Sequence, residues 1–430
     1  MYNFSEFGVD YKTSFLKNKP KICILKRKGA PIHIQACIHA GSRNNSMSGQ
    51  AHFLEHMLVN GTRLYPSKVL LAEALEKVGG YFEATTDADL IRITVSVSQR
   101  KDISLAVTIL NEILTASLYR EDVFENERQV ILREQKDRLR NSSLILMDVF
   151  MKQVYSDFEL RFQNLGTHES VNNLQLKDIV DFAKNNITIE KTTFIVSGDV
   201  EMRDVENLLS EIKLPHGLEK SFIRPQILIK NERVVCKKQE GENSDILIGF
   251  RCDTETLEDV AGLLLIKQMF TGRGSCLIQE LRYKRGLVYG GGVPFWDFNG
   301  TSLFGLRTTC ATEKIEEVLD VTLNVLKEIY LKGISELEYD NLKIKMDSHY
   351  RFNLQTSKEW LEAEVSAERH NIKDDKNMNA LSIPSFIKQI NANRLTEIFR
   401  KYIDLKYAHI VISGSVSENS LEHINKSLSY

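Results

Sequence analysis

The sequence lacks an excess of charge of either sign, long hydrophobic runs and paired cysteines. Its formal net charge is −2 at pH 7, which gives no electrostatic case for binding nucleic acid or an anionic membrane. No segment is apolar for long enough to span a membrane, and Met1 to Pro20 has no run typical of a signal peptide. We therefore expect a cytoplasmic protein without nucleic-acid or membrane partners, although a mature chain that had lost a presequence would look the same.

The cysteines show no C-x-x-C spacing and mostly lie among apolar residues. They therefore indicate buried free thiols. With 430 residues, of which 42% are hydrophobic, the chain is long enough to bury large cores in more than one domain.

One short segment has a defined metal chemistry. Residues 51–57, Ala-His-Phe-Leu-Glu-His-Met, contain the pattern H-x-x-E-H. Side chains at positions i and i+4 of a helix lie one above the other, so His52 and His56 can reach one ion while Glu55 points to the same side. Two imidazoles and a carboxylate in the order found in inverzincins indicate zinc, although cobalt or manganese also binds such sites.

The flanks of the motif favour a helix. Ala51, Leu54 and Leu58 are spaced i, i+3 and i+7, and Asn60-Gly61 is typical of a helix end. The motif is therefore expected on a short helix with one buried face. The alternative is a pair of surface histidines beside a glutamate, which we regard as the weaker interpretation of this spacing.

A third ligand must come from elsewhere, because zinc in hydrolases usually takes three protein ligands and leaves the fourth position to water. The candidate is a second helix, residues 121 to about 140, in which Val123, Glu127, Val130 and Glu134 share one face. Acids on a stripe of valines are costly to bury unless they are paired or bind a metal. One glutamate is thus predicted to be a ligand and the other to orient a ligand; a solvated acidic edge is the alternative.

These motifs together resemble the pitrilysin/insulinase family of zinc peptidases, which includes the mitochondrial processing peptidases. That family pairs H-x-x-E-H with two glutamates of a later helix. Here Glu134 lies 78 positions after His56 (134 − 56) and seven after Glu127 (134 − 127). The resemblance implies that His52, His56 and Glu134 bind one zinc ion per chain. It also implies that Glu55 is the general base and that Glu127 supports a ligand from behind.

The chain is internally repeated. The stretch from residue 176 to 200 recurs from residue 392 to 416, and the copies contain the strands Ile-Val-Ser-Gly (195–198) and Val-Ile-Ser-Gly (411–414). A similar alignment of the two halves places a second helix over the metal motif. It has leucine, lysine and glutamine (264, 267 and 268) in place of His52, Glu55 and His56. The second copy therefore keeps the helix without the ligands.

Each half mixes strands and helices. Residues 91–97 alternate apolar and polar side chains, which predicts a strand buried on one face, and a helix over 102–116 follows. Neighbouring strands with segregated helices indicate an α+β fold of two homologous repeats, each a largely antiparallel sheet with helices packed on it. We expect a zinc-binding catalytic repeat over residues 1–220 and a second repeat without a metal motif over 235–430.

The second repeat has a candidate site of its own. Family peptidases commonly place an arginine and, seven residues later, a tyrosine in this repeat, where the pair contacts substrate and steadies the tetrahedral oxyanion. Arg282 and Tyr289 match that spacing. A guanidinium and a phenol are suitable donors to a developing oxyanion. Without the zinc motif, the same pattern would indicate only a surface arginine and a strand tyrosine.

A further resemblance covers residues 79–86, Gly-Gly-Tyr-Phe-Glu-Ala-Thr-Thr. In the family this edge strand pairs with an extended substrate by strand addition, so Glu83, Ala84 and Thr85 are expected to bind substrate. Glu83 stands where the family usually has asparagine. An acid here either favours a basic or amino-group-bearing substrate residue or disturbs the usual hydrogen bond, so the departure concerns selectivity more than activity.

The leading hypothesis is a zinc metalloendopeptidase that cleaves short or unfolded peptides, with Glu55 activating zinc-bound water. In the family, four repeats enclose a chamber. A chain with two repeats would therefore act as a homodimer, or as a heterodimer with a related subunit, and Arg282 and Tyr289 would serve the partner's zinc. The alternatives are a non-catalytic or partner-dependent subunit of a heterodimeric processing peptidase, and a dedicated maturation protease for a ribosomally made peptide.

Overall fold

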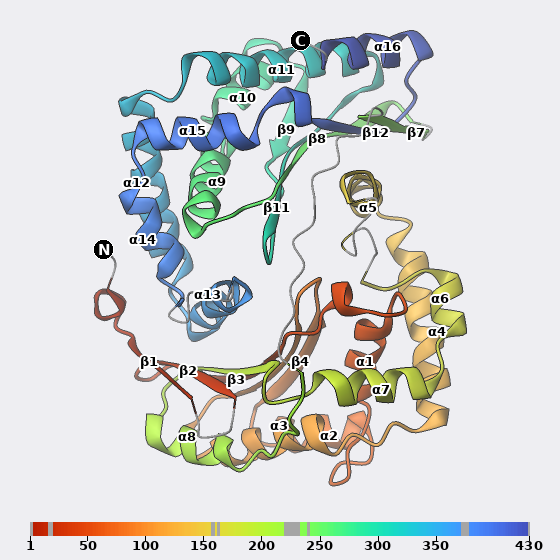
Figure 1. Cartoon of the computed structure of the whole chain (residues 1–430), viewed down its shortest axis with the longest axis vertical. Coiled ribbons are helices and arrows are strands. Elements are labelled where there is room, and N and C mark those ends of the chain that lie inside the picture. Colours follow the sequence, from red (N-terminus) through yellow and green to blue (C-terminus); the bar gives the residue numbers. More distant parts are fainter. Residues whose placement is uncertain are drawn as a thin grey trace.

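The structure is a computed structural model, and it places two halves of mixed helix and sheet one after the other along the chain (Figure 1). The fold class expected from the sequence is confirmed, because each half contains its own largely antiparallel sheet with helices packed on it. No helix within the described part of the chain is both long enough and apolar enough to cross a membrane. The described residues are 3–15, 20–155, 160, 164–218, 233–238, 241–370 and 378–428.

The first half is built on a six-stranded sheet in the order β1-β2-β6-β3-β5-β4, antiparallel except for the parallel pair β2–β6. β4 lies at one edge and pairs, among the described residues, with β5 alone. The strands are β1 (Asp10–Phe15), β2 (Lys21–Lys26), β3 (Ile32–Ile38), β4 (Tyr81–Thr86), β5 (Ile91–Val97) and β6 (Thr192–Gly198). The helices of this half are α1 (Gln50–Leu58), α2 (Lys68–Glu76), α3 (Ile103–Thr115), α4 (Glu121–Arg138), α5 (Ser142–Val154), α6 (His168–Asn173), α7 (Leu176–Asn186) and α8 (Met202–Ser210).

The second half has a sheet in the order β10-β11-β8-β12-β7, and β9 also pairs with β11. The strands are β7 (Val234–Lys237), β8 (Asn243–Cys252), β9 (Val288–Gly292), β10 (Phe295–Phe298), β11 (Thr301–Ala311) and β12 (His409–Ser413). The helices are α9 (Leu257–Phe270), α10 (Cys276–Ile278), the π-helical turn η5 (Gln279–Lys284), α11 (Ile315–Lys332), α12 (Glu336–Asn353), α13 (Ser357–Arg369), α14 (Ser382–Gln389), α15 (Ala392–Tyr402) and α16 (Glu418–Ser427).

The duplication inferred from the sequence is visible element by element. α4 and α12 each have 18 residues and begin 215 positions apart (336 − 121). α7 and α15 each have 11 residues and begin 216 positions apart (392 − 176). The expected boundary between repeats, at about residues 220–235, lies largely outside the described residues, so the limits 1–220 and 235–430 remain a prediction.

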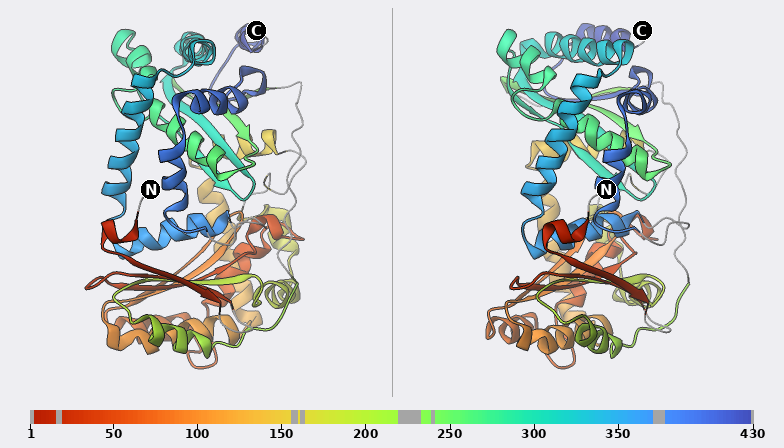
Figure 2. Two further views of the ribbon diagram at one scale, coloured as in Figure 1. Left: turned by 60° about the vertical axis from the view of Figure 1, so that its left-hand side comes forward. Right: turned by 90° about the vertical axis from the view of Figure 1, so that its left-hand side faces the viewer.

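Two helices are exchanged between the halves. α5 of the first half packs on β8 and β12, whereas α13 of the second half packs on β2, β3 and β6 (Figures 1 and 2). Both contacts are apolar: Phe150 of α5 and Trp360 of α13 are each fully buried. The approach of α5 requires a glycine, since a Cβ at Gly249 of β8 would lie 2.2 Å from the Phe150 ring. Each sheet is therefore covered on one face by a helix of the other half.

This exchange corrects the prediction that β5 is buried on one face only. Thr94 and Ser96, expected to face solvent, are 6% and 3% exposed. α13 lies over this face, and its Glu362 accepts a hydrogen bond from Arg92 at 2.7 Å. The buried hydroxyls have partners: Gln35 donates to Thr94, and Ser96 bonds His33. The alternation was wrong about burial because the covering helix lies far away in the sequence.

Candidate metal centre

α1 presents two different faces, as its sequence predicts. Ala51, Leu54 and Leu58 are completely buried against the first half's core. The imidazoles of His52 and His56 lie on the other side, with ring centroids 4.7 Å apart. The residue before the helix is Gly49, whose φ of 98° is in the region that favours glycine. One face thus holds the helix in place while the other offers its polar side chains.

A cluster of two aromatic rings and one arginine fixes α4 against α1. The Phe53 and Phe124 rings stack with centroids 4.5 Å apart, and the guanidinium of Arg128 lies 4.7 Å from the Phe124 centroid. Arg128 is buried and donates a hydrogen bond to the carbonyl of Leu174 at 2.8 Å. This packing sets the register of α4. Arg128 was not identified from the sequence, where it is one charge among many on this helix.

The register of α4 brings its two glutamates to the histidines of α1. The predicted stripe of Val123, Glu127, Val130 and Glu134 is half-buried and borders the fully buried face. The stripe is therefore neither a core face nor a freely solvated edge. It lies at the margin where carboxylates can reach both a partner side chain and a cleft.

The three predicted ligand residues come together. Nε2 of His52 lies 3.7 Å from Oε2 of Glu134, and Nε2 of His56 lies 3.8 Å from the same oxygen. One ligand atom from each residue falls within 4.8 Å of the others. Ligands about 2.0–2.1 Å from a tetrahedral ion are separated by about 3.3 Å, so this donor set fits zinc after small rotamer adjustments. Among the described residues, it is the one His/Cys/Asp/Glu cluster with such geometry.

Glu127 contacts one of the predicted ligand residues. Its Oε2 lies 2.7 Å from Nδ1 of His56, and this hydrogen bond keeps a proton on Nδ1 and leaves Nε2 free for an ion. Burial lowers the pKa of His56, but the hydrogen bond to Glu127 and the carboxylates of Glu55 and Glu134 outweigh it, so the pKa is raised. Burial and the neighbouring His56 lower the pKa of His52 to about 3, so this imidazole is neutral, as a ligand must be.

Glu55 borders a cleft of about 300 Å³ next to the histidines. Burial raises the pKa of the Glu55 carboxyl above its ordinary value. A carboxylate whose pKa is shifted toward neutrality beside a cleft is suited to accept a proton from a bound reactant. The cleft is lined by Glu55, His56, Val59, Lys68, Ala72, Glu76, Tyr81, Phe82 and Ala84.

The edge strand β4 forms one wall of this cleft. Ala84 points into the cleft, whereas Glu83 and Thr85 are exposed on the other face of the strand. The structure adds a partner that the sequence did not indicate, because the Glu83 carboxylate lies 2.8 Å from Nζ of Lys358 on α13. The charge of Glu83 is therefore balanced within the chain.

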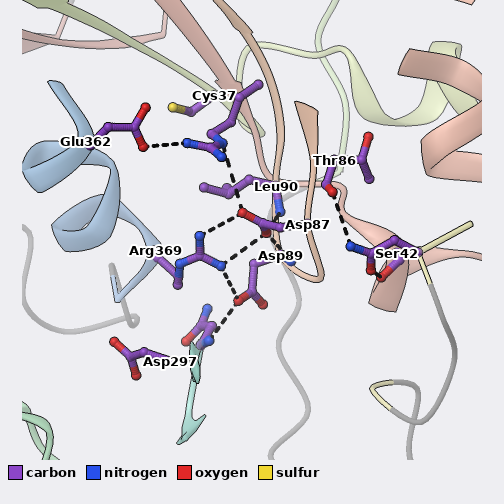
Figure 3. A network of polar contacts seen from close by, with 12 residues as sticks. Cys37, Ser42, Thr86, Asp87, Asp89, Leu90, Asp297, Glu362 and Arg369 are labelled. Atoms are coloured by element: carbon purple, nitrogen blue, oxygen red, sulfur yellow. Dashed lines mark hydrogen bonds and ion pairs between the residues drawn. The ribbon is translucent and has the colours of Figure 1, made fainter. Parts of the chain in front are cut away.

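A buried ion-pair network anchors the turn that follows β4 (Figure 3). Arg369 of α13 lies 2.7 Å from Asp87 and 3.3 Å from Asp89, and Arg43 lies 2.7 Å from Asp89. Asp89 also accepts a hydrogen bond from the backbone N–H of Asn299 in the second half. Burial raises the pKa of Asp87, but Arg369 outweighs it and holds the pKa below its ordinary value. The network ties the end of β4 to the second half.

The two residues expected to steady an oxyanion lie in the other half. Arg282 is on η5 and its guanidinium lies 5.5 Å from the Tyr283 ring centroid, and Tyr289 on β9 is 91% exposed. Neither residue lines the cleft beside Glu55. A single chain thus brings together the predicted metal ligands, Glu55 and β4, but not Arg282 and Tyr289 (Figure 1).

Comparison with known families agrees with this division. Residues 26–168 match the model described as insulinase, peptidase family M16, and residues 173–346 match the model described as the peptidase M16 inactive domain. The chain belongs to this peptidase family. The half that carries the histidines corresponds to the first description, and most of the second model covers the half without ligands.

The relatives include proteins described as uncharacterized zinc proteases. YmxG of Bacillus subtilis is 23% identical over 89% of this chain and 93% of its own length. A protein of Rickettsia bellii is 27% identical over 76% of this chain and 79% of its own. A protease from Helicobacter pylori has the same fold, with a TM-score of 0.84 and 19% identity, and the match covers 95% of this chain and 100% of that one.

Proposed function

We propose that this protein is a zinc metalloendopeptidase. The observation that carries the proposal is the convergence of His52, His56 and Glu134 within 4.8 Å beside the half-buried Glu55. These three residues would hold the ion, and Glu127 would keep His56 in the ligating tautomer. When bound, zinc would supply Lewis-acid chemistry that lowers the pKa of water and polarises a carbonyl.

Glu55 performs the proton transfers of the proposed reaction. Its carboxylate accepts a proton from the attacking water, holds it, and delivers it to the leaving amine nitrogen. The raised pKa of Glu55 supports this role, because the group must both take up and release a proton near neutral pH.

The substrate is proposed to be a short or unfolded peptide that adds as a strand to the open edge of β4. Main-chain hydrogen bonds to an edge strand give affinity that does not depend on the peptide's sequence. The cleft beside Phe82 and Ala84 would receive the peptide's side chains. Folded proteins would be excluded, because they cannot present an extended segment.

Arg282 and Tyr289 are proposed to act in a dimer, at the zinc of the partner chain. Their exposure and their separation from the cleft within one chain support this assignment. The partner is a second copy of this chain or a related subunit; with a second copy, the dimer contains every residue of the proposed site.

The decisive experiment compares the wild type with Glu55→Gln, using Glu73→Gln on α2 as a matched exposed control. Bound metal is measured together with cleavage of a mixed peptide library. We expect zinc in all three proteins and cleavage in the wild type and the control only. Cleavage by Glu55→Gln, or a wild type without metal, would contradict the proposal.

The second candidate function is a subunit that works only with a different partner, and the separation of Arg282 and Tyr289 from the cleft is what favours it. Zinc in the purified chain without cleavage of any library peptide would support it. A dedicated maturation protease would give the same result until its own precursor peptide was supplied.

A further inference from the structure

A second, larger groove adjoins the cleft beside Glu55. It has a volume of about 720 Å³ and lies between the β2–β3 connection of the first half and the beginning of α13. Tyr81, the first residue of β4, lines both spaces, so the cleft and the groove meet at the beginning of the edge strand, with the groove on the face that α13 covers. Arg27 donates a hydrogen bond to the carbonyl of Gln355, which joins the two walls of the groove.

The groove is positively charged, in contrast to the chain as a whole. The described residues that line it include Arg27, Lys28 and Lys358 and no carboxylate, although the chain carries a formal net charge of −2. The cleft beside the histidines differs, because Glu55 and Glu76 both line it. A basic lining in a slightly acidic protein is therefore a local feature of this groove.

Two of these cations are not in an ion pair. Lys358 pairs with Glu83, which lies on β4 just outside the groove, but Arg27 and Lys28 form no ion pair with any residue that the structure describes. Glu359 of α13 is near enough to feel the charge of Arg27, yet its carboxylate accepts hydrogen bonds from two backbone N–H groups before α13. Lys28 is exposed and Arg27 is half-buried, so both can reach a ligand. An anionic ligand would supply the charge that the groove lacks.

The distance from the proposed site of cleavage defines which part of a peptide would reach the groove. A strand advances about 3.3 Å per residue, so a peptide paired with β4 would pass from Ala84 to Tyr81, which borders the groove, in three residues. Side chains about three to six residues from the cleaved bond, on the side toward Tyr81, would lie beside the cations.

We propose that this groove selects peptides with acidic side chains about three to six residues from the cleaved bond. The juxtaposition that carries this inference is an open substrate edge leading into a space lined by three cations and no acid. The inference rests on the proposed peptidase function and extends it to the class of substrate.

The test uses labelled peptides of one sequence that carry either glutamate or glutamine about three to six positions from the cleaved bond, on each side in turn. Their kcat/KM values are measured with the wild type, and their Kd values with Glu55→Gln, which binds without cleaving. The variant is Arg27→Gln/Lys28→Gln. The matched control is Arg203→Gln/Lys184→Gln, which removes the same charges from exposed positions on α8 and α7.

We expect a preference of about tenfold for the acidic peptide on one side of the bond, the order of effect that two or three part-exposed ion pairs supply. The ratio should fall to about one in Arg27→Gln/Lys28→Gln, stay unchanged in the control, and shrink as salt is added. Arg27→Glu/Lys28→Glu should invert the preference toward a lysine-containing peptide, which a purely structural defect would not do.

Equal Kd values for the acidic and neutral peptides on Glu55→Gln would overturn the inference, as would a preference that survives the double substitution. Displacement of the acidic peptide by inorganic phosphate at the same concentration would also overturn it, because the groove would then be a general anion site. If the wild type cleaves neither these peptides nor any peptide of the mixed library, the peptidase proposal fails, whereas the Kd ratio still decides what the groove binds.

Discussion

The two halves of the chain have the same framework, but among the described residues only the first brings a possible set of metal ligands together. When Leu264 is aligned with His52, the buried stripe of α1 corresponds to Leu263, Ile266 and Phe270 of α9, and these are at most 3% exposed. The apolar face is thus kept in both helices. The ligand face is not, because leucine, lysine and glutamine at 264, 267 and 268 stand in place of the motif.

The second helix of the site differs in the same way. When α4 and α12 are aligned from their first residues, Glu127 and Glu134 correspond to Leu342 and His349 of α12. Leu342 is buried, so an apolar side chain stands where Glu127 forms its hydrogen bond with His56 in the first half. Burial of one helix face therefore maintains the fold in both halves, while the residues of the other face can differ without changing it.

The largest effect is expected when a ligand is compared with its counterpart in the other half. Glu134→Gln should lower zinc affinity by more than about 100-fold and should abolish cleavage. Substitution of a residue that only hydrogen-bonds a ligand typically lowers metal affinity by about 10- to 100-fold. His349→Gln should change neither. Calorimetric titration of both variants with zinc tests this. Equal zinc affinities of the two variants would contradict the prediction that only the first half supplies ligands.

The exchanged helices can be compared through their buried side chains. Phe150→Ala in α5 should lower the free energy of unfolding by about 3–5 kcal/mol, measured with denaturant. Val365→Ala, at the corresponding position of α13, removes less volume and should cost less. Gly249→Ala should destabilise the wild type by about 1–3 kcal/mol but be tolerated beside Phe150→Ala, because the ring it meets is gone. Additive losses would contradict this packing.

The division of the proposed site between chains makes a prediction about mixtures. Tyr289→Phe should lower kcat about 100-fold if the phenol donates to an oxyanion. Refolding it with an equal amount of Glu55→Gln should restore up to about a quarter of wild-type activity, because half of the random dimers would have one intact site of two. No recovery in a dimer confirmed by light scattering would argue against a shared site.

The smallest effect concerns acid stability. Arg369 lowers the pKa of Asp87 in the folded protein below its unfolded value of about 3.9, so the pair stabilises the fold at neutral pH. That contribution is lost as the pH falls from the unfolded pKa of about 4 to below the lower pKa that Asp87 has in the folded protein. In denaturant titrations, Asp87→Asn should lower the free energy of unfolding at pH 7, and this free energy should then fall less steeply below pH 4 than in the wild type. The control Asp122→Asn, which changes an exposed side chain, should have neither effect.

The sequence was sufficient for features that depend on local spacing. The i, i+4 spacing predicts that His52 and His56 lie on one face of a helix, and the stripe of α4 identifies its two glutamates. The internal repeat can also be recognised from the sequence alone. The choice of Glu134 as ligand and Glu127 as support comes from family resemblance and stays a prediction; in the structure Glu134 lies near both imidazoles, and Glu127 forms a hydrogen bond with His56.

What the sequence could not provide are contacts between distant segments. Arg369 and Asp87 are 282 positions apart, and Glu83 and Lys358 are 275 apart. Each of these residues belongs to an ordinary charged helix face, strand or turn when viewed alone. Their pairing follows from the placement of α13 on the first sheet, which no periodicity reveals.

The exchange of α5 and α13 means that neither half is complete without the other. A chain divided between residues 218 and 233 would give two fragments, each with one bare sheet face and one helix that fits the other's sheet. Such fragments would be insoluble or unfolded when made separately and would reassemble when made together. The gene could therefore be divided into two cistrons between the codons for residues 218 and 233, but neither repeat could be deleted.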